Sequence, residues 1–306
     1  MTRMVPLSPP NRLPRQGLIL LAALSLCWGI NWPVMKIVLV EIPPLYFRGT
    51  CLLLSGLGLL LIARINGNSI VIPRAHWRHL LAITLINVVG WNVLAIYGVL
   101  LLSSGRAALL AYTMPIWSTL LSVPVLGEAL TRQRLLALAL GLAGIVVLMG
   151  GSLTSFFSTL PGFVAMILAA WAWALGIVLF KRFRIAMPTI SLTGWTMLFG
   201  SFPVLAVAIP LETARLGTPG FWPMAGLFYN VFLSFMFGNW AWNRIVLMVP
   251  VAVSSLSSLV IPLIGVTSGM ILLGEPLGWQ EMLATALILG AVGTVSGNRM
   301  KRLREG

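Results

Sequence analysis

The residues best suited to chemistry in this sequence are amides and indoles within apolar stretches. Trp28, Asn31, Trp32 and Met35 are spaced i, i+3, i+4 and i+7, which places them on one face of a helix. Trp28 and Asn31 lie near mid-depth, so an interfacial belt of tryptophans does not explain them. An amide at that depth needs a polar partner, and this face therefore predicts contact with a polar solute. Simple packing is the alternative interpretation.

Similar residues recur further along the chain. Asn87 and Trp91 lie at i and i+4, and Trp173 aligns with Trp28 at a shift of 145 residues. Trp171 lies about 200° from Trp173 on a helix, so we expect only Trp173 to face inward. The predicted substrate-binding residues are Trp28, Asn31, Trp32, Asn87, Trp91, Tyr112, Trp173 and Ser258. For Ser258, packing of small residues is the stronger alternative.

The predicted site suits a zwitterion. Asn amides can bind a carboxylate, whereas freed carbonyls and the faces of Trp or Tyr can bind an ammonium group. Pro115 and Pro262 are the predicted hinges, because proline lacks a backbone donor and frees a carbonyl one turn earlier. A freed carbonyl would serve as a substrate contact or mark a simple kink. Glu128 and Glu275 follow glycines that end helices, and we interpret both as structural groups beside a helix dipole.

The elements that position these residues are membrane-spanning helices. Of 306 residues, 59% are hydrophobic and 8% are charged, which excludes a soluble enzyme, a disordered chain and a secreted disulfide scaffold. Long uncharged windows, with turn signals at residues 150–152 and 161–162, predict an all-α integral membrane protein of ten transmembrane helices. Cys27 and Cys51 both lie in apolar spans, so we expect neither a disulfide nor a metal site.

The distribution of basic residues predicts the orientation. With the N-terminus inside, 16 of the 20 Lys and Arg are cytoplasmic, and the outer four are Lys36, Arg48, Arg106 and Arg215. Both termini are then cytoplasmic. The same distribution explains the net charge of +14. Because the charge is spread over many short loops, with no basic face of interleaved aromatics, it does not predict nucleic-acid binding.

The second half of the chain resembles the first. Pro115 aligns with Pro262 at a shift of 147 residues, and Gly127-Glu128 aligns with Gly274-Glu275 at the same shift. Five helices per repeat is an odd number, so the repeats must have inverted topology. The predicted organisation is an N-terminal cytoplasmic segment, a first repeat, a periplasmic loop, a second repeat and a cytoplasmic tail: 1–15, 16–150, 151–160, 161–298 and 299–306.

Ten helices in two such repeats, each with Pro, Gly-Glu and a Gly-x-x-Gly helix, resemble the drug/metabolite transporter superfamily, EamA type. Within it, the Trp- and Asn-rich sequence is similar to the YddG-type exporters of aromatic and other amino acids. The resemblance implies a bacterial inner-membrane exporter that works by alternating access, with a central cavity between the halves. It implies amino acids as the small-molecule substrate, the lipid bilayer as the surroundings and a monomer.

Other functions remain as alternatives. The runner-up substrate is another small metabolite, such as a sugar, a nucleotide-linked compound or a drug-like compound. An intramembrane enzyme is disfavoured because the sequence has no Asp and its two His share one loop. A non-transporting scaffold would leave the Asn and Trp face without a purpose. We expect no cofactor, and we expect transport without proton coupling, because no titratable group is an obvious mid-depth carrier.

Overall fold

A computed structural model describes residues 15–127, 131–149, 153–183, 185–248 and 251–305 of the protein, and every element in these ranges is helical. The first half of the chain contains α1 (Arg15–Leu39), α2 (Pro44–Ile65), η1 (Arg74–His76), α3 (Trp77–Ile83), η2 (Thr84–Gly90), α4 (Trp91–Leu101), α5 (Ser104–Ala111), α6 (Met114–Leu126) and α7 (Arg132–Met149). No strand occurs within these described ranges, as the sequence predicts.

The second half follows the same order. Its elements are α8 (Leu153–Phe183), α9 (Thr189–Glu212), η3 (Thr213–Arg215), α10 (Phe221–Phe228), η4 (Tyr229–Phe237), α11 (Gly238–Met248), α12 (Val251–Leu273) and α13 (Trp279–Glu305). Residues 153–160 of the expected periplasmic loop at 151–160 are helical and belong to α8, and Pro161 lies inside that helix. Pro161 is the ninth residue of α8 and cannot donate to the carbonyl one turn earlier, so packing between helices overrides the turn signal at 161–162.

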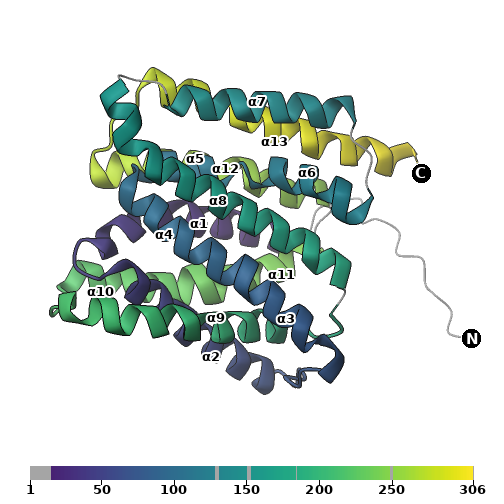
Figure 1. The fold of residues 1–306 in the computed structure, drawn as a ribbon. Coiled ribbons are helices and arrows are strands. Elements are labelled where there is room, and N and C mark those ends of the chain that lie inside the picture. Colours follow the sequence, from purple (N-terminus) through teal and green to yellow (C-terminus); the bar gives the residue numbers. More distant parts are fainter. Residues whose placement is uncertain (1–14, 128–130, 150–152, 184, 249–250, 306) are drawn as a thin grey trace, which may run out of the picture.

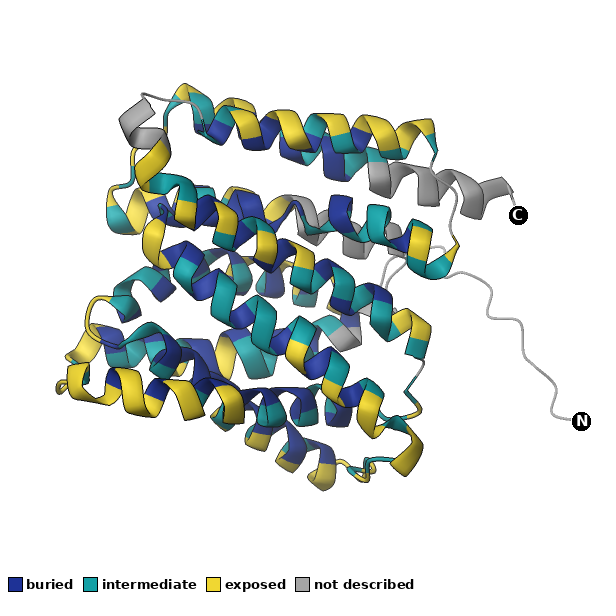
Figure 2. Ribbon diagram, viewed as in Figure 1, coloured by how far each residue is buried: buried dark blue, intermediate teal, exposed yellow. Residues whose placement is uncertain are grey.

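The helices have the length and composition of membrane spans. Within the described residues, eight helices are long and apolar enough to cross a bilayer, and Val260–Leu273 is a shorter apolar helix. Large apolar side chains stay exposed on the outside of the bundle, including Ile65, Val146 and Ile271 at 74%, 66% and 74%, and Figure 2 shows exposed residues along the outward faces. Such a surface suits lipid. The count of ten spans remains a prediction.

The two halves of the chain interleave in the bundle. α2 packs along α9 on one side of the molecule, and α7 packs along α13 on the other (Figure 1). Between these pairs, α1 packs on α12, and α8 packs on both α4 and α6. Each of these pairs joins a helix of the first half to one of the second, so the interior of the bundle is an interface between the halves.

Two helices contain a π-helical segment, η2 and η4, at matching places in the two halves. A π-helix bonds i to i+5, so it leaves some carbonyls without their usual partner. Asn92 Nδ2 donates to the Val88 carbonyl at 2.9 Å, and Asn239 Nδ2 donates to the Phe235 carbonyl at 2.6 Å. These two Asn residues, aligned at a shift of 147, therefore stabilise equivalent helix irregularities.

Candidate functional site

The predicted face of α1 lies inside the bundle. The Trp28 indole donates to the Ser234 carbonyl of η4 at 3.0 Å, and its ring lies 6.2 Å from that of Trp242. Trp32 is buried against α12, where a Cβ added to Gly265 would lie 3.1 Å from its ring. The Asn31 side-chain oxygen is buried and accepts no hydrogen bond. This oxygen is therefore a buried acceptor that no hydrogen bond from the described residues satisfies.

A second group of predicted residues meets where α8 crosses the first half. The rings of Trp91 and Trp173 have centroids 4.6 Å apart, and Tyr112 meets Trp173 edge-on at 6.2 Å. Asn87 Nδ2, on η2, donates to the Trp173 carbonyl at 3.2 Å. Trp173 thus joins three of the predicted residues through one side chain and one carbonyl. Tilted and edge-on rings of this kind offer both apolar surface and negative ring faces.

The structure does not bring all eight predicted residues into one contact group. Trp28 and Trp32 contact η4, α11 and α12, whereas Asn87, Trp91 and Tyr112 meet at Trp173 of α8. One hydrophobic cluster nevertheless includes Trp28, Trp32, Trp91 and Tyr112. Trp171 is 39% exposed and packs on Trp117, so the choice of Trp173 as the inward residue agrees with the geometry. The Ser258 side chain lies outside the described part of the structure.

The two predicted hinge prolines differ. Pro115 is in the first turn of α6, directly after the interruption at Tyr112 and Thr113 that separates α5 from α6. Pro262 lies inside the continuous helix α12. A proline in a first turn fills a position whose N–H has no intrahelical partner, so only Pro262 interrupts an otherwise regular hydrogen-bond ladder. The expected symmetry of the two hinges is therefore incomplete.

Carboxylates connect the two halves of the chain at one end of the bundle, the left of Figure 1. Glu212, at the end of α9, accepts from the backbone N–H groups of Leu45 at 3.2 Å and Tyr46 at 2.7 Å, at the start of α2. Glu41, between α1 and α2, accepts from the N–H of Gly220 at 2.6 Å, just before α10. Both carboxylates stabilise the positive end of a helix from the other half.

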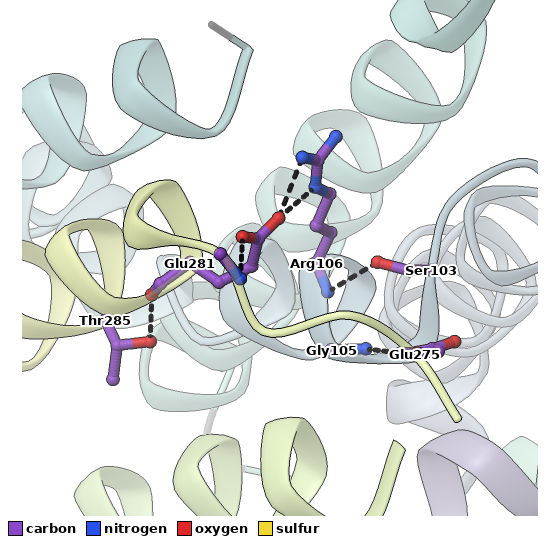
Figure 3. A network of polar contacts seen from close by, with 7 residues as sticks. Ser103, Gly105, Arg106, Glu275, Glu281 and Thr285 are labelled. Atoms are coloured by element: carbon purple, nitrogen blue, oxygen red, sulfur yellow. Dashed lines mark hydrogen bonds and ion pairs between the residues drawn. The ribbon is translucent and has the colours of Figure 1, made fainter. Parts of the chain in front are cut away.

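The same end holds a second carboxylate group (Figure 3). Glu275 accepts from Ser104 N at 2.6 Å, Ser104 Oγ at 2.8 Å and Gly105 N at 3.1 Å, at the start of α5. Arg106 forms an ion pair with Glu281 of α13 at 2.7 Å. Glu275 thus has the structural role predicted for it, but it caps a helix far away in sequence. We call Glu41, Glu212, Glu275 and Glu281 the carboxylate latch.

The opposite end of the bundle has different contacts between the halves. Arg182 donates to the Val125 carbonyl at 2.6 Å, and the Trp195 indole donates to the Ile70 carbonyl at 2.7 Å. Each is a single hydrogen bond to a backbone carbonyl. Glu128, the sequence counterpart of Glu275, lies outside the described residues. In the part of the chain that the structure describes, the carboxylate latch therefore carries more charge-assisted contacts than the other end.

Comparison with known proteins identifies the family. A model of the EamA-like transporter family matches residues 15–150 and 160–297, which is most of the chain. The chain belongs to the EamA-like transporter family. It is accordingly a multi-pass membrane protein and a transporter.

This EamA-like transporter is similar to several bacterial proteins over nearly their full lengths. It is 28% identical to a probable amino-acid metabolite efflux pump of Salmonella typhimurium, covering 90% of this chain and 93% of that protein. It is 26% identical to the uncharacterized transporter YoaV of Bacillus subtilis, covering 88% and 91%. One crystal structure shares the fold with a TM-score of 0.65 at 19% identity, covering 92% of this chain and 97% of that one.

The sequence did not reveal several residues of this transporter's interior. Ser234 contributes a backbone carbonyl, so its side chain carries no signal. Glu41 and Glu212 are isolated acids near helix ends, and their partners are far away in sequence. A glutamate beside a helix start would have indicated a local cap, but an inter-half contact needs the three-dimensional pairing of helices.

Proposed function

We propose that this transporter exports amino acids, aromatic and other neutral ones, across the bacterial inner membrane by alternating access. The observation that carries the proposal is the interior itself. It combines the unpartnered Asn31 oxygen with the aromatic group of Trp91, Tyr112 and Trp173. Such surroundings suit a small solute with both polar and apolar parts. The similarity to proteins named amino-acid metabolite efflux pumps supports the same substrate class.

We further propose that the chain forms ten spans in two inverted five-helix repeats, with both termini cytoplasmic. Equivalent pairs of positions are hydrogen-bonded in the two halves, which supports this arrangement. Asn87 of η2 bonds the carbonyl of Trp173 on α8, and Trp28 of α1 bonds the carbonyl of Ser234 on η4. Asn87 aligns with Ser234, and Trp173 aligns with Trp28. A two-fold axis between the halves would exchange the two residue pairs, although the side-chain donor is on the η segment in one pair and on α1 in the other.

Alternating access requires that the halves separate at one end while they close at the other. In the proposed topology the carboxylate latch lies at the outer end, because α2, α5, α10 and α13 all begin there. Its contacts join one half to the other, so they hold the outer end closed. The solute would enter from the cytoplasm in this state and leave after the latch opens. Weak binding through amides and aromatic faces favours release.

Counterflow in liposomes tests the proposal. Purified transporter is reconstituted with unlabelled phenylalanine, leucine or serine inside, and uptake of the labelled amino acid is measured without a pH difference. We expect uptake above that of empty liposomes for the aromatic and large neutral amino acids. Uptake only with an imposed proton gradient would refute uncoupled transport, whereas uptake of sugars or nucleotide-linked compounds alone would refute the substrate class.

A further inference from the structure

The most unusual charge in the bundle is Arg48, in the second turn of α2. Its side chain is 4% exposed. The guanidinium lies 5.1 Å from the ring centroid of Phe47 and 5.5 Å from that of Phe235 on η4, and it donates to the sulfur of Met35 on α1. Its Nε is buried and has no hydrogen-bond partner. The group is therefore enclosed by α1, α2 and η4 among aromatic rings and a weak sulfur acceptor.

No carboxylate among the described residues neutralises this cation. Glu212 and Glu275 accept from backbone amides, and Glu281 pairs with Arg106. A buried guanidinium without an anion is costly in a protein interior and more so in a membrane, and cation–π contacts with Phe offset only part of that cost. An arginine that served packing alone would be replaced there by a methionine or leucine without loss. A buried guanidinium with an unused donor is therefore suited to bind an anion for part of the transport cycle.

We propose that Arg48 binds the carboxylate of the transported solute. This inference rests on the proposed amino-acid transport and assigns the group that recognises the anionic end of the substrate. A guanidinium offers several N–H donors in a planar fork that matches a carboxylate. Arg48 keeps at least one such donor unused. The solute anion would replace the Met35 sulfur, a poor acceptor, as its partner.

The position of Arg48 relative to Asn31 fits a zwitterion. Met35, which contacts Arg48, lies four residues after Asn31 on the same face of α1, which is about 6 Å along the helix. The unpartnered Asn31 oxygen can accept from an ammonium group, while Arg48 binds the carboxylate. A single guanidinium matches one negative charge. A phosphorylated compound would need further cations in contact with its phosphate. The contacts of the Arg48 guanidinium among the described residues are Phe47, Phe235 and Met35, which carry no charge.

The test compares solutes that differ only in the carboxylate. Phenylalanine and phenylalaninamide, and benzoate and benzamide, are measured for thermal stabilisation of the detergent-solubilised full chain and, for the first pair, for counterflow. In the wild type we expect the acid to bind about tenfold or more tightly than the amide, because the amide cannot form the charge-assisted contact with the guanidinium. Arg48→Met should abolish this preference, and Arg48→Lys should retain part of it because the charge remains. Arg64→Met, exposed at the other end of α2, should keep the wild-type ratio.

Folding provides an independent readout. Without solute, Arg48→Met should melt at the same or a higher temperature than the wild type, because it removes a buried unpaired charge. An unchanged acid-to-amide ratio in Arg48→Met would overturn the inference, as would failure of both Arg48 variants to fold. Inorganic phosphate that stabilises the wild type more than either acid would overturn the choice of a carboxylate. Arg48-dependent preference for benzoate, with no amino-acid counterflow in the wild type, would support the anion site and refute the proposed substrate.

Discussion

Replacing Glu275 with Gln should open the outer end of the transporter. The carboxylate accepts three hydrogen bonds from the start of α5, with donors at Ser104 N, Ser104 Oγ and Gly105 N. Gln keeps one acceptor oxygen but presents an NH₂ group to the remaining donors. The substitution also removes the negative charge beside the helix start. The contact that holds α12 to α5 is therefore weakened, whereas the fold of each half is retained.

The magnitude follows from the number of bonds. Hydrogen bonds to a charged group contribute about 1.5–3 kcal/mol each, but water replaces much of this at a half-exposed site. We expect a net loss of about 2 kcal/mol, which corresponds to an about 30-fold rise in the ratio of outward-open to outward-closed molecules. Spin labels are attached to cysteines placed at Leu101 and Trp279 in a background without Cys27 and Cys51. Distances between the labels, measured by double electron–electron resonance, report this ratio.

The control for this measurement is Arg215→Gln. Arg215 is an exposed charge at the same end of the bundle, and no hydrogen bond or ion pair joins it to the described residues of the other half. The Arg215→Gln variant should show the same distribution of label-to-label distances as the wild type. An identical distribution for Glu275→Gln and wild type would refute the latch, and an equal shift in both variants would indicate a general effect of charge rather than the α5 contact.

Three further outcomes are expected. Cysteines at Asn66 and Thr218, both exposed, should react with an impermeant reagent from opposite sides of the membrane, and reaction from one side would exclude the proposed topology. Trp173→Ala should reduce counterflow at least tenfold with normal folded yield, whereas Leu136→Ala on the lipid-facing side should not; a loss of thermal stability alone would make Trp173 a packing residue. Pro262→Ala should slow exchange more than it changes solute affinity, because it restores the ladder of α12, and equal losses of rate and affinity would instead indicate direct contact.

Composition and hydropathy predicted the class of fold, because membrane helices are apolar over their whole length. Helix irregularities were not predictable in the same way. The π-helical segments η2 and η4 are mainly apolar with one Asn each, a composition that does not distinguish them from the neighbouring α-helices, and Pro161 lies inside α8 although proline is a turn signal. In both cases packing between helices overrides the local preference of the chain.

The candidate site was predictable only in part. Helical spacing identified the face of α1 that lies inside the bundle, and the alignment of Trp173 with Trp28 in the repeat was the reason to choose Trp173 over Trp171. Neither could show that Trp28 bonds η4 while Trp173 meets Trp91 and Tyr112, because that depends on which helices meet. Arg48 was expected to lie toward the outer side as an ordinary charge near a helix end. Its burial arises from Phe235 and Met35, which reach it from two other helices.

The short helix α5 connects the carboxylate latch at its first turn to the aromatic group of Trp91, Tyr112 and Trp173 at its last turn, so a movement at one end can be transmitted to the other. Its first residues, Ser104 and Gly105, bond Glu275, and Tyr112 directly after its last residue meets Trp173. Eight residues make a rod about 12 Å long. If the break at Tyr112 and Thr113 acts as the pivot, a tilt of about 10° moves the outer end of the rod by about 2 Å, enough to break its hydrogen bonds to Glu275. A solute that displaces the Tyr112 ring by a small angle would thus release the outer end of the transporter through a single stiff element.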